Sequence, residues 1–353
     1  MATLNESATQ SISSTSDYCI DQSIVKRFER CKIDEAVSED MPSNRNENNE
    51  DEDESKWTLY SASEHDTKRC KIDEAVSEDM PSNRNENNED EDESKWTLYS
   101  ASEHDTKFDP DQYLDGFYKT ANEDFAMQVV LFFLPGIIYR MPSTVKTLLD
   151  LGAGPTVYVP IVFRNRAEHI YSSDYAEVNR EAVRMWVEER CKFDWVHICE
   201  HIASIEPKKQ SALEMQQQAR KKLRAILKVD VHSDEVIQGV HYKVGDTPQP
   251  IPKLFQVVAT IFCLEYASET FDDYRRAVRG AVSLIETGGY LVQGGVLNAK
   301  EYSFGRRRFK CHTLTKQQLL QSLKENGMET ENGANFKLII HDDIFVLISR
   351  KNQ

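Results

Sequence analysis

The chain has 353 residues with a formal net charge of −16 at pH 7, and this charge is unevenly distributed. Residues 1–107 carry 28 Asp and Glu against 12 Lys and Arg, which leaves 31 residues of each sign in residues 108–353. A neutral C-terminal part offers no basic surface for nucleic acid. The sequence lacks apolar runs long enough for a membrane span, its N-terminus lacks the pattern of a signal peptide, and seven scattered cysteines suit a reduced compartment. These features predict a cytoplasmic protein that binds neither nucleic acid nor a membrane.

A tandem repeat occupies most of the N-terminal part, because residues 30–68 and 69–107 have identical sequences. Each copy carries 12 acidic and 5 basic residues, with too few large apolar side chains to offset the entropy of ordering. We therefore expect a disordered acidic region over residues 1–107 and a folded domain over residues 108–353. Each copy also contains an aromatic run, Trp57–Tyr60 or Trp96–Tyr99, for which a docking motif is the alternative to an inert tail.

From Phe108 onward, apolar runs alternate with amphipathic segments, which is typical of an α/β fold with a parallel sheet covered by helices. The expected strands are Thr147–Asp150, Ile170–Ser173, Leu227–Val231, Gln256–Phe262 and Tyr290–Gln293, and the expected helices are Glu123–Ile138, Ala176–Glu189, Ala212–Leu227 and Phe271–Glu286. Gly288 and Gly289 are expected to end the last helix. Two further β-rich runs, Phe336–His341 and Ile344–Ser349, are separated by only two residues, which predicts an antiparallel hairpin.

A glycine-rich loop, Asp150–Gly154 (DLGAG), follows the first expected strand, where glycines let the backbone approach a ligand closely. Asp174 follows Gly152 by 22 residues, at the end of the next strand, where a carboxylate can bind ribose hydroxyls. Dinucleotide enzymes and S-adenosylmethionine enzymes share this arrangement, and a glycine turn without a ligand is the remaining alternative.

Two details favour S-adenosylmethionine over a dinucleotide. The dinucleotide pattern needs a small third residue for helix packing, but Val157 stands there and Pro155 follows Gly154 directly. In addition, Asp150 would repel a phosphate but could stay near a cationic sulfonium.

Four segments resemble one family, the small-molecule amine N-methyltransferases that act on nicotinamide, phenylethanolamine, thioethers and indolethylamines. They are Phe108–Tyr118, Asp150–Tyr158, Asp174–Asn179 and Phe262–Glu265, and the match extends over about residues 108–353. The resemblance implies a seven-stranded, Rossmann-like class I methyltransferase sheet whose final hairpin inserts an antiparallel strand. It also implies S-adenosyl-L-methionine as the cofactor and a monomeric enzyme.

The resemblance further implies roles for individual residues. The cofactor-binding residues are then Tyr113, Tyr118, Gly152, Ala153, Tyr158, Asp174, Tyr175, Asn179, Asp230 and Val231. Phe262, Glu265 and Tyr302 are substrate-binding by the same resemblance, and Glu265 and Tyr113 are catalytic. A pyridine nitrogen has a free lone pair and needs no base, whereas a protonated amine must first lose a proton, with help from Glu265.

Two other polar clusters are interpreted without a ligand. His197, Cys199 and His201 lack the second ligand pair of a zinc site, so no metal is expected. The basic run Gly305–Lys310 is expected to be a solvated loop.

The sequence departs from the family where acceptor specificity is set. The nicotinamide-specific member has a second acid where Gly295 stands here, and the phenylethanolamine-specific member has one where Ala299 stands. Glu301 lies close by in the sequence, and whether it replaces the missing acid is left open. The expected function is S-adenosylmethionine-dependent N-methylation of nicotinamide or a related pyridine, with a biogenic amine as the alternative acceptor. A catalytically silent cofactor-binding protein and a dehydrogenase are further alternatives, but retention of Asp174 and Glu265 argues against silence.

Overall fold

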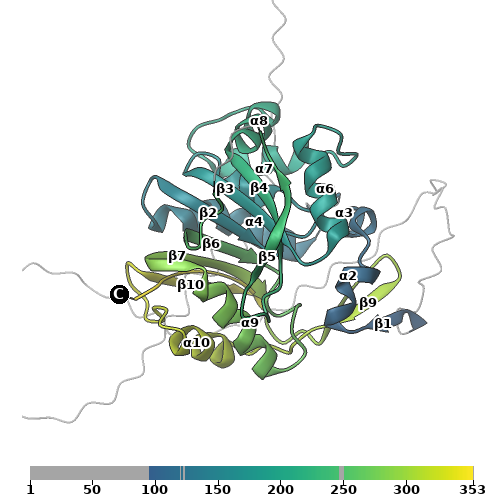
Figure 1. Ribbon diagram of the computed structural model, residues 1–353, viewed down its shortest axis with the longest axis vertical. Coiled ribbons are helices and arrows are strands. Elements are labelled where there is room, and N and C mark those ends of the chain that lie inside the picture. The colour runs from purple at the N-terminus through teal and green to yellow at the C-terminus, as the bar shows by residue number, and fades with distance from the viewer. Residues whose placement is uncertain (1–94, 120, 122–123, 246–249, 353) are drawn as a thin grey trace, which may run out of the picture. The chain divides into compact units, whose positions relative to one another are not determined.

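The computed structural model describes residues 95–119, 121, 124–245 and 250–352 (Figure 1). The first repeat copy and the predicted disorder of residues 1–94 therefore lie outside the described residues. A central eight-stranded sheet has the order β10-β11-β7-β6-β2-β3-β4-β5. Its strands are β2 (Val145–Leu151), β3 (Ala167–Asp174), β4 (Leu223–Val229), β5 (Ile237–Lys243), β6 (Phe255–Ile261), β7 (Ile285–Val296), β10 (Phe336–His341) and β11 (Ile344–Arg350).

The five strands expected from the sequence form the parallel centre of this sheet, in the order β7-β6-β2-β3-β4. The predicted hairpin is also confirmed, since β10 and β11 pair antiparallel and β11 lies between β10 and β7. Its two turn residues, Asp342 and Asp343, both have positive φ, as tight hairpin turns require. The eighth strand, β5, was not expected, and it pairs antiparallel with β4 at the sheet edge.

Helices cover both faces of the central sheet (Figure 1). They are α3 (Pro110–Phe117), α4 (Phe125–Ile137), η4 (Ile138–Arg140), α5 (Tyr158–Phe163), α6 (Glu177–Val187), α7 (Val196–Ile205), α8 (Ala212–Lys222), α9 (Phe271–Ser283) and α10 (Lys316–Glu325). None of the described helices combines the length and apolarity that a membrane crossing needs.

Alternation along β2 shows how the two cores are divided. Leu148 packs in the core that contains the apolar residues of α4, α5, α7 and α8, whereas Leu149 and Leu151 pack in the core of α9 and α10. Successive side chains of a strand point to opposite faces, so a strand between two helical layers must be apolar on both. The continuous apolar run of β2 follows from this constraint.

Two predicted helix ends are wrong. The helix from Ala212 ends at Lys222 instead of Leu227, because Leu223 already begins β4 and pairs with Ile170 of β3. The helix from Phe271 ends at Ser283, before the glycines that were expected to stop it. Gly288 and Gly289 lie within β7, where a Cβ on Gly289 would come within 2.7 Å of the carbonyl oxygen of Gln256. Gly289 therefore permits the close approach of β7 to β6.

The predicted boundary between residues 107 and 108 is also too late. The end of the second repeat copy forms β1 (Thr97–Tyr99), η3 (Ala101–Glu103) and α2 (His104–Lys107). Strand β1 pairs in parallel with β9 (Arg307–Lys310), which pairs antiparallel with β8 (Glu301–Phe304). The aromatic run Trp96–Tyr99 is thus a docking segment for its own domain.

Tertiary contacts, rather than local composition, hold this N-terminal segment in place. The Tyr99 ring lies 5.5 Å from the Phe309 ring, and the Ala101 amide donates to the Glu269 carboxylate at 2.9 Å. These partners are more than 160 positions away in the sequence, so a composition argument confined to the acidic repeat could not detect them.

We expect two truncations to differ sharply. Deleting residues 1–94 should leave the melting temperature unchanged if that region is disordered as predicted. Deleting residues 1–107 also removes β1 and α2, and the loss of their contacts should lower the melting temperature by roughly 3 °C or more. Differential scanning calorimetry of both variants checks this, and equal melting temperatures would show that the N-terminal segment contributes nothing to stability.

Candidate active site

The order in which successive parallel strands are added to the sheet reverses at β2, because β3 pairs with one side of β2 and β6 with the other. Ligands of open parallel sheets bind outside the carboxyl ends of the strands at such a switch point. A cavity of about 270 Å³ lies there. Its lining residues come from the N-terminal segment, from the ends of β2, β3, β4 and β6, and from β8: Ala101, Ser102, His104, Phe108, Tyr113, Tyr118, Gly152, Ala153, Gly154, Thr156, Tyr158, Asp174, Tyr175, Asn179, Val229, Asp230, Val231, His232, Ile261, Phe262, Cys263, Tyr266, Ala267 and Tyr302.

All ten residues predicted to bind the cofactor line this cavity, together with Phe262 and Tyr302 from the predicted acceptor site. Glu265 is not among the described residues that line it. Three lining residues that the sequence analysis did not consider, His104, Phe108 and Tyr266, complete the wall beside Tyr302. Tyr266 directly follows Glu265, but His104 lies in the segment that composition predicted to be disordered.

The glycine loop is shaped by both backbone conformation and space. Gly152 and Gly154 have φ values of +72° and +60°, in the left-handed region that favours glycine. A Cβ on Gly152 would lie 2.1 Å from the Cys263 Sγ, whereas a Cβ on Gly154 would meet nothing within 4 Å. The loop after β2 therefore rests directly on the residue that follows β6, and its Gly154 side is open to a ligand.

Asp174 connects this loop to the start of α6. Its Oδ2 accepts from the Gly154 amide at 2.8 Å, and its Oδ1 accepts from the Ala176 amide at 2.9 Å and from Asn179 Nδ2 at 3.1 Å. Burial raises the pKa of the carboxyl, and these hydrogen bonds oppose that rise. Asp174 thus holds the glycine loop and the start of α6 together at this end of the cavity.

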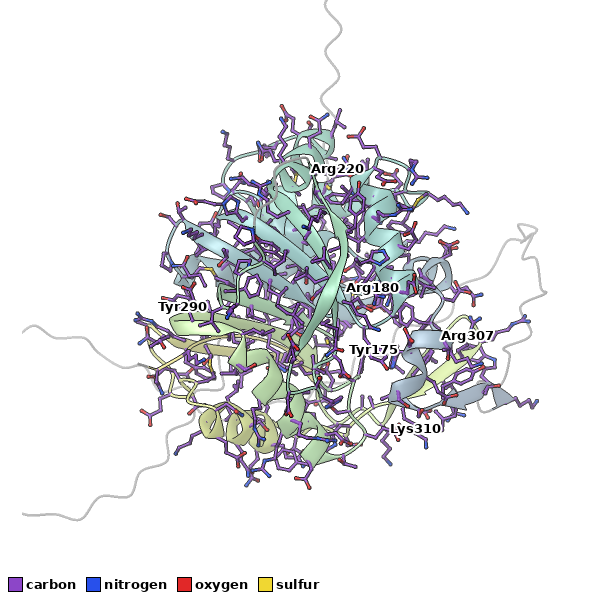
Figure 2. The ribbon with its side chains drawn as sticks, viewed as in Figure 1. Tyr175, Arg180, Arg220, Tyr290, Arg307 and Lys310 are labelled. Carbon is purple, nitrogen blue, oxygen red and sulfur yellow. The ribbon has the colours of Figure 1, made fainter. Side chains whose placement is uncertain are left out.

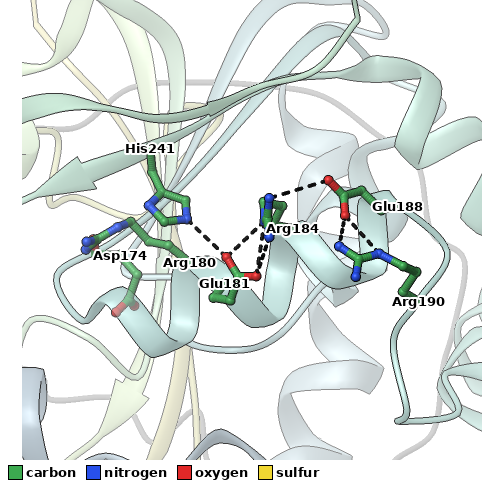
Figure 3. A network of polar contacts seen from close by, with 7 residues as sticks. All are labelled: Asp174, Arg180, Glu181, Arg184, Glu188, Arg190 and His241. Atoms are coloured by element: carbon green, nitrogen blue, oxygen red, sulfur yellow. Dashed lines mark hydrogen bonds and ion pairs between the residues drawn. The ribbon is translucent and has the colours of Figure 1, made fainter.

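Arg180 fixes the backbone at this point, and the ion pairs of Glu181, Arg184, Glu188 and Arg190 follow it along the chain (Figure 3). Its Nη1 donates to the carbonyl oxygens of Asp174 at 3.0 Å and Tyr175 at 2.5 Å, and Arg180 is buried. Further along α6, Arg184 forms ion pairs with Glu181 and Glu188 at partly exposed positions. Exposed pairs contribute about 0–1 kcal/mol, so Arg180 matters most for the geometry of the site.

Asp150 lies beneath the loop and is not one of the described residues that line the cavity. It is 2% exposed, and burial, followed by the charge of Asp174, raises its pKa well above the usual range. Because burial disfavours a charged carboxylate at this position, the argument from the charge of Asp150 against a dinucleotide is weakened.

The turn after β4 forms a further part of the cavity wall. Asp230 Oδ1 accepts from the His232 amide at 2.9 Å, and His232 Nε2 lies 2.9 Å from the carbonyl oxygen of Ala267. This bond joins the turn after β4 to the turn after β6. Asp230 and Val231 thereby reach the cavity at a fixed position.

Three tyrosines form a continuous wall from the N-terminal helices to the glycine loop. Ring centroids lie 5.9 Å apart between Tyr113 and Tyr118 and 5.7 Å apart between Tyr118 and Tyr158. Burial raises the pKa of each phenol, so the rings are neutral. Neutral aromatic faces attract a sulfonium cation by about 0.5–2 kcal/mol each.

The opposite end of the cavity is aromatic and uncharged. The Tyr302 ring stacks on Tyr266 at 4.1 Å with an interplanar angle of 12°, and the Tyr266 ring lies 6.1 Å from Phe262. The His104 ring lies nearly parallel to the Tyr302 ring, with centroids 5.9 Å apart. These parallel rings favour a flat aromatic ligand.

Glu265 is fully buried beside this end. Its Oε1 accepts from the Val296 amide at 3.1 Å, while its Oε2 has no hydrogen-bond partner within the described part of the chain. Burial raises the pKa of the carboxyl to about 7, against which the backbone hydrogen bonds act. A Cβ on Gly295 would lie 2.3 Å from Oε1 and 2.9 Å from Oε2. Glu265 therefore occupies the space that a side chain at Gly295 would need.

The other polar clusters are engaged elsewhere. Glu301 forms a bidentate ion pair with Arg308, with N–O distances of 2.7 and 2.8 Å, so it does not replace the missing family acid. The basic run is not a solvated loop but the turn and strand of the β8–β9 hairpin, and Arg307 contacts Asp109 at 3.4 Å (Figure 2). His197 contacts the carbonyl oxygen of Tyr118 at 2.7 Å, and no group of potential metal ligands occurs among the described residues.

The fold and this cavity define the chain as an S-adenosylmethionine-dependent methyltransferase. Residues 96–352 match the NNMT/PNMT/TEMT family, and the chain belongs to this family. It is 53% identical to nicotinamide N-methyltransferase of Caenorhabditis elegans over 245 residues, which are 69% of this chain and 89% of that protein. It is 28% identical to phenylethanolamine N-methyltransferase of Mus musculus over 197 residues, 56% of this chain and 64% of that protein.

Among solved structures, magnesium protoporphyrin IX methyltransferase of Synechocystis PCC 6803 with bound S-adenosylmethionine superposes with a TM-score of 0.44 and 9% sequence identity, and the match covers 71% of this chain and 95% of that one. The family match and the similarity to nicotinamide N-methyltransferase confirm the predicted family, enzyme class and cofactor. The residues of the cavity fit the cofactor, because they combine an open glycine cradle, a buried carboxylate and cation-attracting rings.

Gly152→Ala should weaken S-adenosylmethionine binding more than tenfold, because the methyl group overlaps Cys263 and the positive φ is strained. Gly154→Ala is the matched control. Its methyl group has no clash, so it adds only the conformational strain of a positive φ, about 1–2 kcal/mol. Calorimetric titration of both variants measures the difference. Cys263→Gly removes the atoms that clash, so it should recover part of the affinity when it is combined with Gly152→Ala. If the effects of the two substitutions on the binding free energy were strictly additive, the contact between these residues would be contradicted.

Glu265 should make the folded state less stable as the pH rises. Its folded pKa of about 7 lies above the usual 4.5, so its stabilising contribution is fully present below pH 4.5 and is lost as the pH passes 7. The loss amounts to about 3 kcal/mol. Urea unfolding between pH 4 and 8 should therefore show a smaller decline in the free energy of unfolding for Glu265→Gln than for the unmodified chain. Parallel pH curves would refute the raised pKa.

Proposed function

We propose that the enzyme methylates the ring nitrogen of a neutral pyridine carboxamide, nicotinamide or a close relative. The observation that carries this proposal is the absence of charge at the acceptor end among the described lining residues. Phe262, Tyr266, Tyr302 and His104 surround that end, whereas the lining carboxylates, Asp174 and Asp230, belong to the cofactor end.

Charge decides between the two classes of acceptor. A protonated amine would have to leave water without a lining carboxylate to pair with, and an unpaired buried charge is strongly unfavourable. A pyridine is neutral at pH 7 and keeps its lone pair, so binding it carries no such penalty. The 53% identity to a nicotinamide N-methyltransferase supports the same choice.

The proposed roles of the chain's residues are binding and orientation. When bound, S-adenosylmethionine supplies an electrophilic methyl group. Asp174 and Asn179 would hold the ribose, Asp230 and Val231 the adenine, and the faces of Tyr113, Tyr118 and Tyr158 the cationic part. Methyl transfer depends chiefly on holding the reacting atoms about 3–3.5 Å apart and in line. The stacked rings of Tyr266 and Tyr302 orient a flat acceptor for this purpose, and no residue has to remove a proton.

A second candidate acceptor is a biogenic amine. It is favoured by the pKa of about 7 at Glu265, which suits a general base at neutral pH, and by the similarity to phenylethanolamine N-methyltransferase. This function requires the Glu265 carboxyl to turn from Val296 toward the cavity. Catalytic participation of Glu265 therefore belongs to the amine proposal, and a pyridine acceptor does not need it.

The proposal also includes a monomer in the cytoplasm. Cys191, Cys199, Cys263 and Cys311 are free thiols, which supports a reducing compartment.

An acceptor panel tests the proposed function. With S-adenosylmethionine present, nicotinamide should be methylated with a kcat/KM at least tenfold above those of phenylethanolamine and tryptamine, and mass spectrometry should find the N-methylpyridinium product. Asp174→Ala is the negative control, since it removes the residue that organises the cofactor end. Glu265→Gln should retain most of the nicotinamide turnover. Preference for an amine, together with loss of turnover in Glu265→Gln, would establish the second candidate instead.

A further inference from the structure

His104 and Tyr302 form a hydrogen-bonded pair at the acceptor end of the cavity. The Nδ1 of His104 lies 2.5 Å from the carbonyl oxygen of Ala101, and its Nε2 lies 2.5 Å from the Tyr302 hydroxyl. The His104 ring also stacks on Phe309 at 4.6 Å, with an interplanar angle of 19°. The imidazole is therefore held at both nitrogens and on one face.

This arrangement determines the direction of each hydrogen bond. A carbonyl oxygen can only accept, so Nδ1 must carry the proton and donate to Ala101. Burial lowers the pKa of His104, which favours the neutral ring. Nε2 of a neutral ring protonated at Nδ1 can only accept, so the Tyr302 hydroxyl donates to it. The Tyr302 oxygen is left with lone pairs alone to offer the cavity.

Two backbone acceptors of the cavity wall already have donors. The Ala101 carbonyl accepts from His104, and the Ala267 carbonyl lies 2.9 Å from the His232 ring nitrogen. A ligand with an N–H group next to its aromatic ring thus finds the Tyr302 oxygen available and correctly polarised. A ligand that offers only an acceptor at this position would face the lone pairs of the Tyr302 oxygen and could not form a hydrogen bond with it.

We infer that His104 is a positioning residue that fixes the Tyr302 hydroxyl as a hydrogen-bond acceptor and thereby selects methyl acceptors carrying a carboxamide N–H. This inference rests on the proposed function, since it assumes that a pyridine carboxamide occupies the aromatic end. It assigns a role in the acceptor site to the N-terminal segment, which brings His104 to β8 through the pairing of β1 with β9.

The test compares two ligands of nearly equal shape. Nicotinamide carries the N–H group, and 3-acetylpyridine replaces the amide nitrogen with a methyl group. Affinities are measured by calorimetry in the presence of S-adenosylhomocysteine, so that the result does not depend on turnover. The unmodified chain should bind nicotinamide about tenfold more tightly, the typical effect of one hydrogen bond.

The informative variant is the full chain with His65→Phe and His104→Phe. Phenylalanine keeps a ring beside Phe309 but cannot accept from Tyr302, and changing both residues excludes a contribution from the identical first repeat copy. The preference for nicotinamide should fall to within about twofold, and Tyr302→Phe should have the same effect. His65→Phe alone is the matched control and should change nothing. His104→Gln retains an acceptor oxygen and should recover part of the preference.

The outcomes separate the two proposals. Binding of both pyridines with an unchanged preference in the His65→Phe, His104→Phe variant would overturn the role of His104 and leave the proposed function intact. An equal loss of both affinities would do the same, because it indicates a structural role only. Failure of the unmodified chain to bind either pyridine would overturn the proposed function and this inference together.

Discussion

The close approach of the loop after β2 to the residue after β6 is the constraint on which the site depends. Gly152 leaves no room for a Cβ against Cys263, so these two strand ends are held in direct contact. Strands β2 and β6 are neighbours in the sheet, and the switch point lies between them. Gly152, Ala153 and Gly154 of the glycine loop line the cavity beside this contact, and the turn after β6 adds Phe262 and Tyr266 to the same cavity. In the proposed function, the methyl donor and its acceptor would therefore meet there.

The N-terminal segment then closes the aromatic end. Residues 95–107 repeat residues 56–68 without a change, and only a few of them are apolar. The segment is held by the pairing of β1 with the sequence-distant β9 and by the contacts of His104 with Tyr302 and Phe309. The fold thus uses a segment of disorder-like composition as a wall of the site, which is possible because main-chain pairing does not depend on apolar side chains.

This explains which features could be predicted from the sequence. The parallel strands, the terminal hairpin and the position of Asp174 follow from local apolar runs and from the spacing between a glycine loop and the next strand. His104 and β1 could not be predicted, since their ordering comes from partners far along the chain. Strand β5 alternates partly buried and exposed residues at the sheet edge, so it lacks the apolar run of an inner strand. The orientation of Glu265 depends on packing against Gly295, which no local pattern reveals.

Glycine at position 295 has a physical explanation in this packing. With Glu265 turned toward the Val296 amide, a side chain at position 295 would overlap its carboxyl group, so the two cannot coexist in this arrangement. Two acids so close would also raise each other's pKa and disfavour a shared negative charge. One buried carboxyl with a pKa of about 7, withdrawn from the cavity surface, leaves the acceptor end nearly neutral. The departure from the family pattern and the uncharged acceptor site are therefore two consequences of the same contact.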